Sequence, residues 1–74
     1  MKLTKREKEI TDLFFKGYTI DEIAQKLFIS PKTARTHRAR IYQKLNVHSL
    51  SELFLRRIKQ LEKERQDIWR NILF

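Results

Sequence analysis

Glycine and proline are nearly absent from this chain of 74 residues, which contains one of each. Because these two residues make most of the tight turns that join strands, their scarcity leaves little material for hairpins. No segment alternates apolar and polar residues as a half-buried strand does, whereas several segments repeat apolar residues every three or four positions. The sequence therefore predicts a fold that is helical almost throughout.

Capping signals predict where the helices begin and end. A hydroxyl and a carboxylate three residues apart form a capping box, which satisfies free backbone N–H groups at a helix start. Three pairs have this spacing: Thr4 and Glu7, Thr19 and Glu22, and Ser49 and Glu52. Ser30 followed by Pro31 is another start signal, because proline at the first helical position gives up an N–H that has no partner there. Gly17 and Asn46 are expected to end helices in the left-handed conformation. The predicted helices cover about residues 5–16, 20–27, 31–45 and 50 to nearly 74.

Two of these helices predict a helix-turn-helix, since a turn of three or four residues joins 20–27 to the strongly basic 31–45. Projected at about 100° per residue, the second helix has an inner face formed by Ala34, Ile41 and Leu45. Its outer face bears Lys32, Thr36, Ala39 and Gln43, flanked by Arg35 and Arg40. A solvated surface helix is the simpler interpretation of such a face. The short preceding helix, the tight turn and the Ser-Pro start favour contact with DNA instead.

The overall charge also favours a polyanionic partner. Seventeen Lys and Arg residues outnumber nine Asp and Glu residues, giving a net charge of +8 and a pI near 10.2. Nucleic acid or an anionic membrane surface fits this balance. No apolar run has membrane-spanning length and no signal-peptide core is present, so we expect a cytoplasmic protein without a membrane partner. The absence of cysteine excludes thiolate zinc sites and redox chemistry, and the small size favours oligomerisation.

The helix over 31–45 has side chains that suit the major groove. The guanidinium fork of Arg35 or Arg40 matches O6 and N7 of guanine, and the methyl groups of Thr36 and Ala39 can lie against a thymine methyl. Positions near the helix N-terminus suit phosphate, because free N–H groups point there. The phosphate candidates from this reasoning are Lys32, Thr33, Thr19, Arg38 and Lys44.

Short motifs follow one another in a fixed order: Leu3-Thr4-x-Arg6-Glu7, Glu22-Ile23-Ala24, Ser30, Lys32-Thr33, His37 and Lys44-Leu45-x-Val47. In this order they resemble the LuxR/FixJ/GerE-type helix-turn-helix family of bacterial transcription regulators, over about residues 3–58. The resemblance implies a four-helix domain whose third helix enters the major groove and whose fourth forms a two-fold dimer. The base-reading positions that it implies are Arg35, Thr36 and Ala39, with Arg40 adjacent. The phosphate-binding positions that it implies are Thr19, Lys32, Thr33, His37 and Lys44.

The sequence departs from the family pattern at several positions. Ala39 stands where some members have a long basic residue, so its readout is expected to be limited to a methyl contact. Thr11 stands where leucine is common and Phe15 where a small residue is common. Met1 lies two residues before the motif, which indicates a stand-alone, GerE-like regulator without a preceding sensor domain. A chain cut from a longer parent is the alternative.

The helix-turn-helix domain is expected to cover residues 1–58, with residues 59–74 as a helical extension that continues the fourth helix. Apolar residues recur there at steps of three and four, the spacing of a coiled-coil seam, although Arg65 interrupts it. The predicted dimerisation residues are Phe54, Ile58, Leu61, Ile68, Trp69 and Ile72. We expect the apolar tip to dock on the dimer mate, since an exposed tip would be adhesive. The alternative is that the tip folds back on its own core.

Catalysis has little support, because His37 and His48 are the only histidines and neither has paired carboxylates or metal-ligand spacing. We therefore expect no enzyme activity, metal, cofactor or small-molecule ligand. The prediction is an all-α, LuxR-type helix-turn-helix protein with an extended fourth helix. It would bind double-stranded DNA sequence-specifically as a homodimer on an operator with two half-sites and regulate bacterial transcription at the nucleoid. RNA polymerase is a further candidate partner. The alternatives are an adaptor that binds a protein through its apolar tail, a polymerase sigma-factor region 4, and a membrane-surface helix over 50–74.

Overall fold

The computed structural model describes the backbone of residues 2–73 and the side chains of residues 2–65. Over residues 2–73 the chain forms four helices and no strand, which confirms the all-α prediction. The helices are α1 (Lys5–Phe15), α2 (Ile20–Lys26), α3 (Pro31–Leu45) and α4 (Leu50–Leu73). Their predicted bounds hold to within a residue: α1 and α2 each end one residue early, because Lys16 and Leu27 act as C-caps.

The predicted N-caps are present at all four helix starts. The Thr4 hydroxyl accepts the Glu7 N–H at 3.2 Å, and the Glu7 carboxylate accepts the Thr4 N–H at 2.7 Å. The same reciprocal bonds begin α2. At α4 the predicted capping box is modified: Ser49 Oγ accepts the Glu52 N–H at 3.1 Å, but the Glu52 carboxylate accepts the N–H of His48, not that of Ser49. The Glu52 carboxylate thus fixes the backbone of His48 in the connection between α3 and α4.

The ends of α1, α2 and α3 share one geometry, the Schellman motif. In each, one residue with positive φ closes the helix, and the next residue donates its N–H to a carbonyl five residues back. These bonds are Tyr18 to Leu13 at 3.1 Å, Ile29 to Ala24 at 3.0 Å and Val47 to Tyr42 at 2.9 Å. The residues with positive φ are Gly17 at 93°, Phe28 at 56° and Asn46 at 55°. Gly17 and Asn46 confirm the predicted terminators, and Phe28 takes the same conformation after α2 without having been predicted to do so.

The core lies where α1, α2 and α3 meet the first turns of α4. Its buried side chains are Ile10, Phe14, Ile23, Ile41, Val47 and Leu53. Ala24 of α2 and Ala34 of α3 are also buried. Small side chains at both positions allow helix axes to approach closely, which suits two helices joined by a short turn. Thr11, one of the departures from the family pattern, is buried and donates its hydroxyl to the carbonyl of Glu7 at 2.8 Å.

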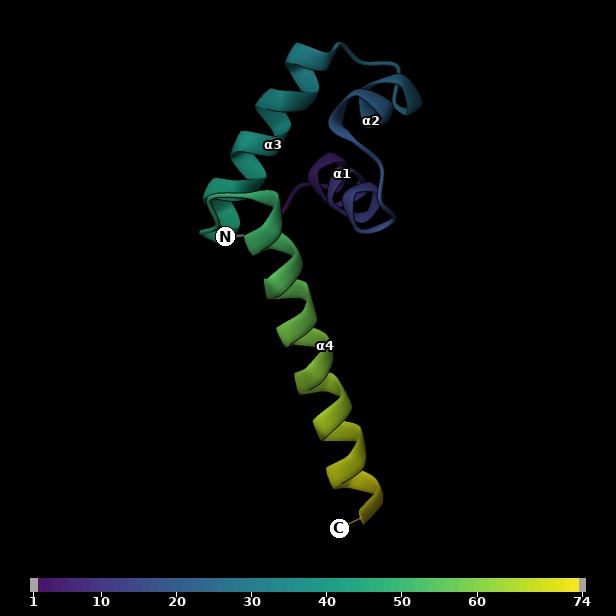
Figure 1. Ribbon diagram of the computed structural model, residues 1–74, viewed down its shortest axis with the longest axis vertical. Helices are drawn as coiled ribbons and strands as arrows, with labels where there is room; N and C mark the ends of the chain where they lie inside the picture. Colours follow the sequence, from purple (N-terminus) through teal and green to yellow (C-terminus); the bar gives the residue numbers. More distant parts are fainter. Residues whose placement is uncertain (1, 74) are drawn as a thin grey trace.

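The fourth helix leads away from the bundle formed by α1, α2 and α3 (Figure 1). The molecule is therefore elongated, with extents of 50 × 22 × 21 Å. Because α4 continues as one helix to Leu73, the alternative in which its tip folds back on its own core is not the arrangement found. Within the part of the chain that the structure describes, no helix has the length and apolar character needed to cross a membrane.

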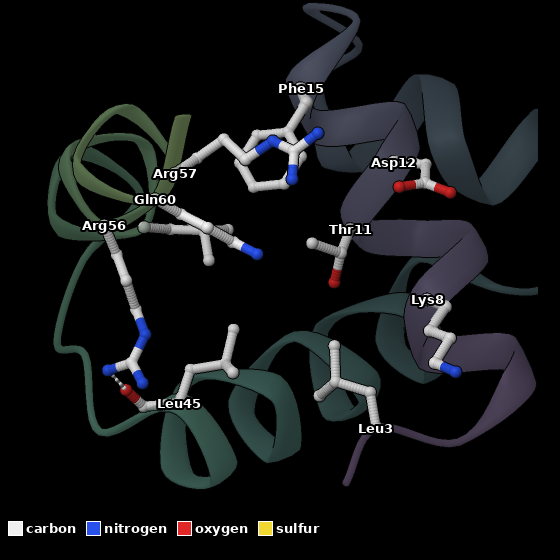
Figure 2. Close-up of a pocket in the computed structure, with 10 residues that line it drawn as sticks. Leu3, Lys8, Thr11, Asp12, Phe15, Leu45, Arg56, Arg57 and Gln60 are labelled. Carbon is white, nitrogen blue, oxygen red and sulfur yellow. Dashed lines mark hydrogen bonds between the residues drawn. The ribbon is translucent and has the colours of Figure 1, made fainter. Parts of the chain in front are cut away.

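Three contacts fix the base of α4 against the bundle. The rings of Phe15 and Phe54 lie 5.7 Å apart, and the guanidinium of Arg57 lies 5.4 Å from the centre of the Phe15 ring. Arg56 donates from Nη1 to the carbonyl of Leu45 at the end of α3, at 2.5 Å. Figure 2 shows Phe15, Arg56 and Arg57 around the groove between α1 and α4. The aromatic contact and Arg57 thus hold α4 to α1, and Arg56 holds it to the end of α3.

Candidate nucleic-acid interface

The outer face of α3 is exposed and its inner face is buried, as the helical projection predicted. Ala34 and Ile41 have no accessible surface and point into the bundle. The exposed side chains on the other side are Lys32, Arg35, Thr36, Ala39, Arg40 and Gln43. The helix contains no acidic residue. In Figure 1 α1 and α2 lie on the same side of α3.

Four positions at the middle of this face form one patch. Arg35 and Ala39 are four residues apart, as are Thr36 and Arg40, so the two pairs lie side by side along the helix. The Thr36 side chain is exposed, and its hydroxyl donates to the carbonyl of Lys32 at 3.1 Å. The patch thus combines two small groups with two guanidinium forks. That combination can distinguish thymine methyl groups from guanine acceptors.

The start of α3 carries groups that suit phosphate. Ser30 Oγ accepts the Thr33 N–H at 3.0 Å and donates to Thr33 Oγ1 at 2.8 Å, so the Thr33 hydroxyl can donate its own proton outward. Lys32 is exposed beside it. Backbone N–H groups and the positive end of the helix dipole add to this favourable field for an anion.

The other predicted phosphate contacts lie around the edges of this face. Thr19 is the exposed N-cap of α2, and its hydroxyl accepts the Glu22 N–H at 3.2 Å. The Thr19 N–H donates to the Glu22 carboxylate in return. This backbone bond, and to a smaller extent the bond with the Thr19 hydroxyl, lowers the pKa of Glu22. His37 and Arg38 are half-buried along the flanks of α3. Each of these assignments stays a prediction of the sequence.

Lys44 has a structural partner that the sequence did not reveal. Its Nζ lies 2.6 Å from Oε1 of Glu7, whose side chain is only 2% exposed, while that of Lys44 is 22% exposed. The Lys44 ammonium and the Thr4 N–H hold the pKa of the Glu7 carboxyl down at about 2. Glu7 therefore caps α1 and joins it to the end of α3. Lys44 neutralises this buried carboxylate, and its contact with phosphate stays a prediction.

Acid should weaken the fold through Glu7. The folded pKa of about 2 lies below the value of about 4.3 in an unfolded chain, so the carboxylate contributes stability that is complete above about pH 5 and lost as pH falls toward 2. The urea midpoint should decrease over this range, and less steeply for Glu7→Gln. Glu9→Gln is the control, because Glu9 lies in a surface pair with Arg6, 43% exposed on each side. An unaltered acid dependence in Glu7→Gln would contradict this role.

The predicted dimerisation residues differ in their surroundings. Phe54 packs on Phe15 of its own chain, whereas Ile58 and Leu61 are 49% and 45% exposed. The side chains of Ile68, Trp69 and Ile72 lie outside the described residues. Among the side chains described, no cluster of three histidine, cysteine or acidic residues could hold a metal ion.

Comparison with known proteins agrees with this geometry. The family model "Bacterial regulatory proteins, luxR family" matches residues 1–56. The oxygen regulatory protein NreC of Staphylococcus carnosus is 55% identical over 51 residues, which are 69% of this chain and 24% of that protein. NreC of Staphylococcus epidermidis is 51% identical over 51 residues, or 69% of this chain and 23% of that protein. The chain thus spans about a quarter of the length of these relatives.

A solved structure shares the fold as well. The response regulator ChrA of a heme-sensing two-component system superposes with a TM-score of 0.73 at 35% identity, covering 81% of this chain and 30% of that one. Proteins of the matched family are DNA-binding regulators of transcription and not enzymes. From the match over residues 1–56 and the four-helix fold, we conclude that this chain belongs to the LuxR family of bacterial regulatory proteins.

Proposed function

We propose that the protein binds double-stranded DNA sequence-specifically by placing the outer face of α3 in the major groove. The observation that carries this proposal is the exposed, acid-free face of α3 opposite its buried Ala34 and Ile41. The base-reading residues are Arg35, Thr36, Ala39 and Arg40. The phosphate-binding residues are Thr19, Lys32, Thr33, His37, Arg38 and Lys44. Through this contact and through RNA polymerase, the protein would regulate transcription in the bacterial cytoplasm, at the nucleoid.

The two groups of residues have different tasks. Phosphate contacts give affinity that depends on salt and fix the orientation of the helix on the duplex. Base contacts give the preference for one sequence over another, and each good pair of hydrogen bonds contributes about 1–3 kcal/mol of discrimination. The position of Lys32 and Thr33 at the helix start suits the first task, and the central patch around Arg35 suits the second.

Selection from random duplex DNA tests this function directly. Purified protein is incubated with a random pool, and bound duplexes are sequenced after several rounds. We expect two related half-sites to be enriched at one fixed spacing, about one helical turn or a multiple of it. Salt-sensitive binding without any enriched sequence would contradict sequence-specific readout and would leave a non-specific DNA binder.

The same proposal includes a homodimer formed through α4, with residues 59–74 as its dimerisation extension. Ile58 and Leu61 are three residues apart on α4 and are exposed in the single chain. In a monomer these apolar side chains stay in contact with water, whereas a pair of α4 helices would bury them. Pairing is therefore favoured. Phe54, which packs on Phe15, would form the base of this interface.

Leu61→Glu should abolish the dimer, because it would place two carboxylates in the apolar seam. Sedimentation equilibrium is expected to give the monomer mass of 9.1 kDa for this variant and twice that mass for the native chain. Gln60→Glu is the matched control, since it introduces the same charge one residue away, on the side of the groove between α1 and α4. A native chain that sediments as a monomer at all concentrations would exclude the dimer.

A further inference from the structure

One of the three Schellman motifs has an unexpected residue at its left-handed position. Glycine and asparagine are the residues that tolerate this conformation, and they occupy it after α1 and α3 as Gly17 and Asn46. After α2 the position is held by Phe28, with φ of 56°. A phenylalanine at positive φ strains the backbone, because its Cβ approaches the following carbonyl oxygen. The local fold therefore does not explain why an aromatic residue stands there.

Packing does not explain it either. The Phe28 side chain is 96% exposed, which makes it the most exposed of the large apolar side chains described. Ile29, the next residue, is half-buried. An aromatic ring left in water contributes nothing to the hydrophobic core, so its stabilising contacts have to come from outside the chain.

The position of the ring indicates which partner it meets. Phe28 stands two residues before Ser30, the N-cap of α3, and the turn over residues 27–30 lies at the N-terminal end of α3, at the top of Figure 1. Lys32 and Thr33 follow within five residues and are exposed at the same end. The ring thus borders the end of the proposed DNA-binding face where phosphates are expected.

Duplex DNA presents apolar atoms beside its phosphates. The deoxyribose carbons and the thymine methyl group are both accessible at the edge of the major groove, and a phenyl ring can lie against either of them. We propose that Phe28 is a DNA-contact residue whose ring packs against these apolar atoms beside the phosphates held by Lys32 and Thr33. This inference rests on the proposed function of α3.

The proposal separates affinity from stability, which a structural role would not do. Phe28→Gly removes the ring and places glycine at a position that favours it, so the variant should unfold at the native temperature or about 2–5 °C higher. Its affinity for the duplex enriched from the random pool should fall about tenfold, because apolar contact area is lost. The dependence of affinity on salt should stay the same, because no charge is removed.

Two variants are matched to this one. Asn46→Gly makes the same replacement at the equivalent position after α3 and should keep native affinity. Phe28→Tyr retains an aromatic ring and should keep most of the affinity. Replacing thymidine with deoxyuridine in the duplex distinguishes the two sources of apolar atoms. If Phe28→Gly then costs nothing further, the ring contacts a thymine methyl group, and if the tenfold loss persists, it contacts deoxyribose.

Other outcomes overturn the inference. Native affinity in Phe28→Gly, beside a weakened Arg35→Ala, would show that the ring has no role in DNA binding. A loss of both stability and affinity in Phe28→Gly would assign it to the fold. A native chain that binds no duplex DNA would remove the proposed function, and this inference with it.

Discussion

Lys44→Met is expected to lower the thermal unfolding midpoint by about 10 °C or more, because removing one partner of a buried pair leaves an uncompensated charge. The ammonium of Lys44 lies 2.6 Å from the Glu7 carboxylate, which is almost without solvent contact. Methionine preserves most of the volume of the lysine stem but supplies no charge. Thermal unfolding followed by circular dichroism measures the effect.

A double variant separates the contribution of the Glu7–Lys44 pair to stability from the contribution of each residue alone. Glu7→Gln together with Lys44→Met removes both charges and retains an oxygen that can accept the Thr4 N–H, a bond of 2.7 Å in the native chain. This variant should regain most of the stability that Lys44→Met loses, since two uncharged groups need no mutual compensation. If Lys44→Met alone unfolds at the native temperature, the Glu7–Lys44 pair does not hold α1 to the end of α3.

Arg35→Ala should weaken binding to the selected duplex by about 1–3 kcal/mol and relax the preference at one base position. The reason is that Arg35 carries a bidentate donor in the central patch of α3, where a guanine can be read through O6 and N7. Binding is measured by competition between the selected duplex and its single-base variants. The loss of affinity should be largest for the duplex that keeps the selected base at the position read by Arg35.

Lys32→Ala is the control for that measurement. It should weaken binding to selected and random duplexes alike, and it should lower the slope of affinity against salt by about one unit, because one phosphate contact is lost. Equal losses for Arg35→Ala and Lys32→Ala on random DNA would mean that base reading and phosphate binding are not divided between these residues.

Local signals explain why most of the fold could be predicted. The caps Thr4, Thr19 and Ser30 act on residues within one turn of themselves, so their spacing alone identifies a helix start. The inner and outer faces of α3 follow in the same way from its period. The modified cap at His48 lay beyond this reasoning, because the carboxylate of Glu52 can reach either of two neighbouring N–H groups.

Contacts between distant residues could not be predicted. Glu7 and Lys44 are separated by 37 positions, and both motifs that contain them suggested other tasks, capping and phosphate binding. Phe28 follows α2 at the position that Gly17 occupies after α1, but a phenylalanine does not by itself indicate a left-handed residue. Which residues read bases and which bind phosphate stays a prediction, since exposure on one face does not distinguish between them.

The clamped connection between α3 and α4 has a consequence for the DNA sequences that the protein can accept. Arg56 and the turn at Asn46 hold α4 to the end of α3, and the ring pair of Phe15 and Phe54 holds it to α1, so α4 leaves the bundle at one angle. In two copies joined through α4, the two α3 helices would then lie at one fixed distance and one fixed rotation relative to each other. Inserting even one base pair between the half-sites moves the second half-site by about 3.4 Å along the duplex. It also rotates that half-site about the duplex axis, away from the second α3 helix. Spacing, as much as base identity, would then define the genes that such a protein controls.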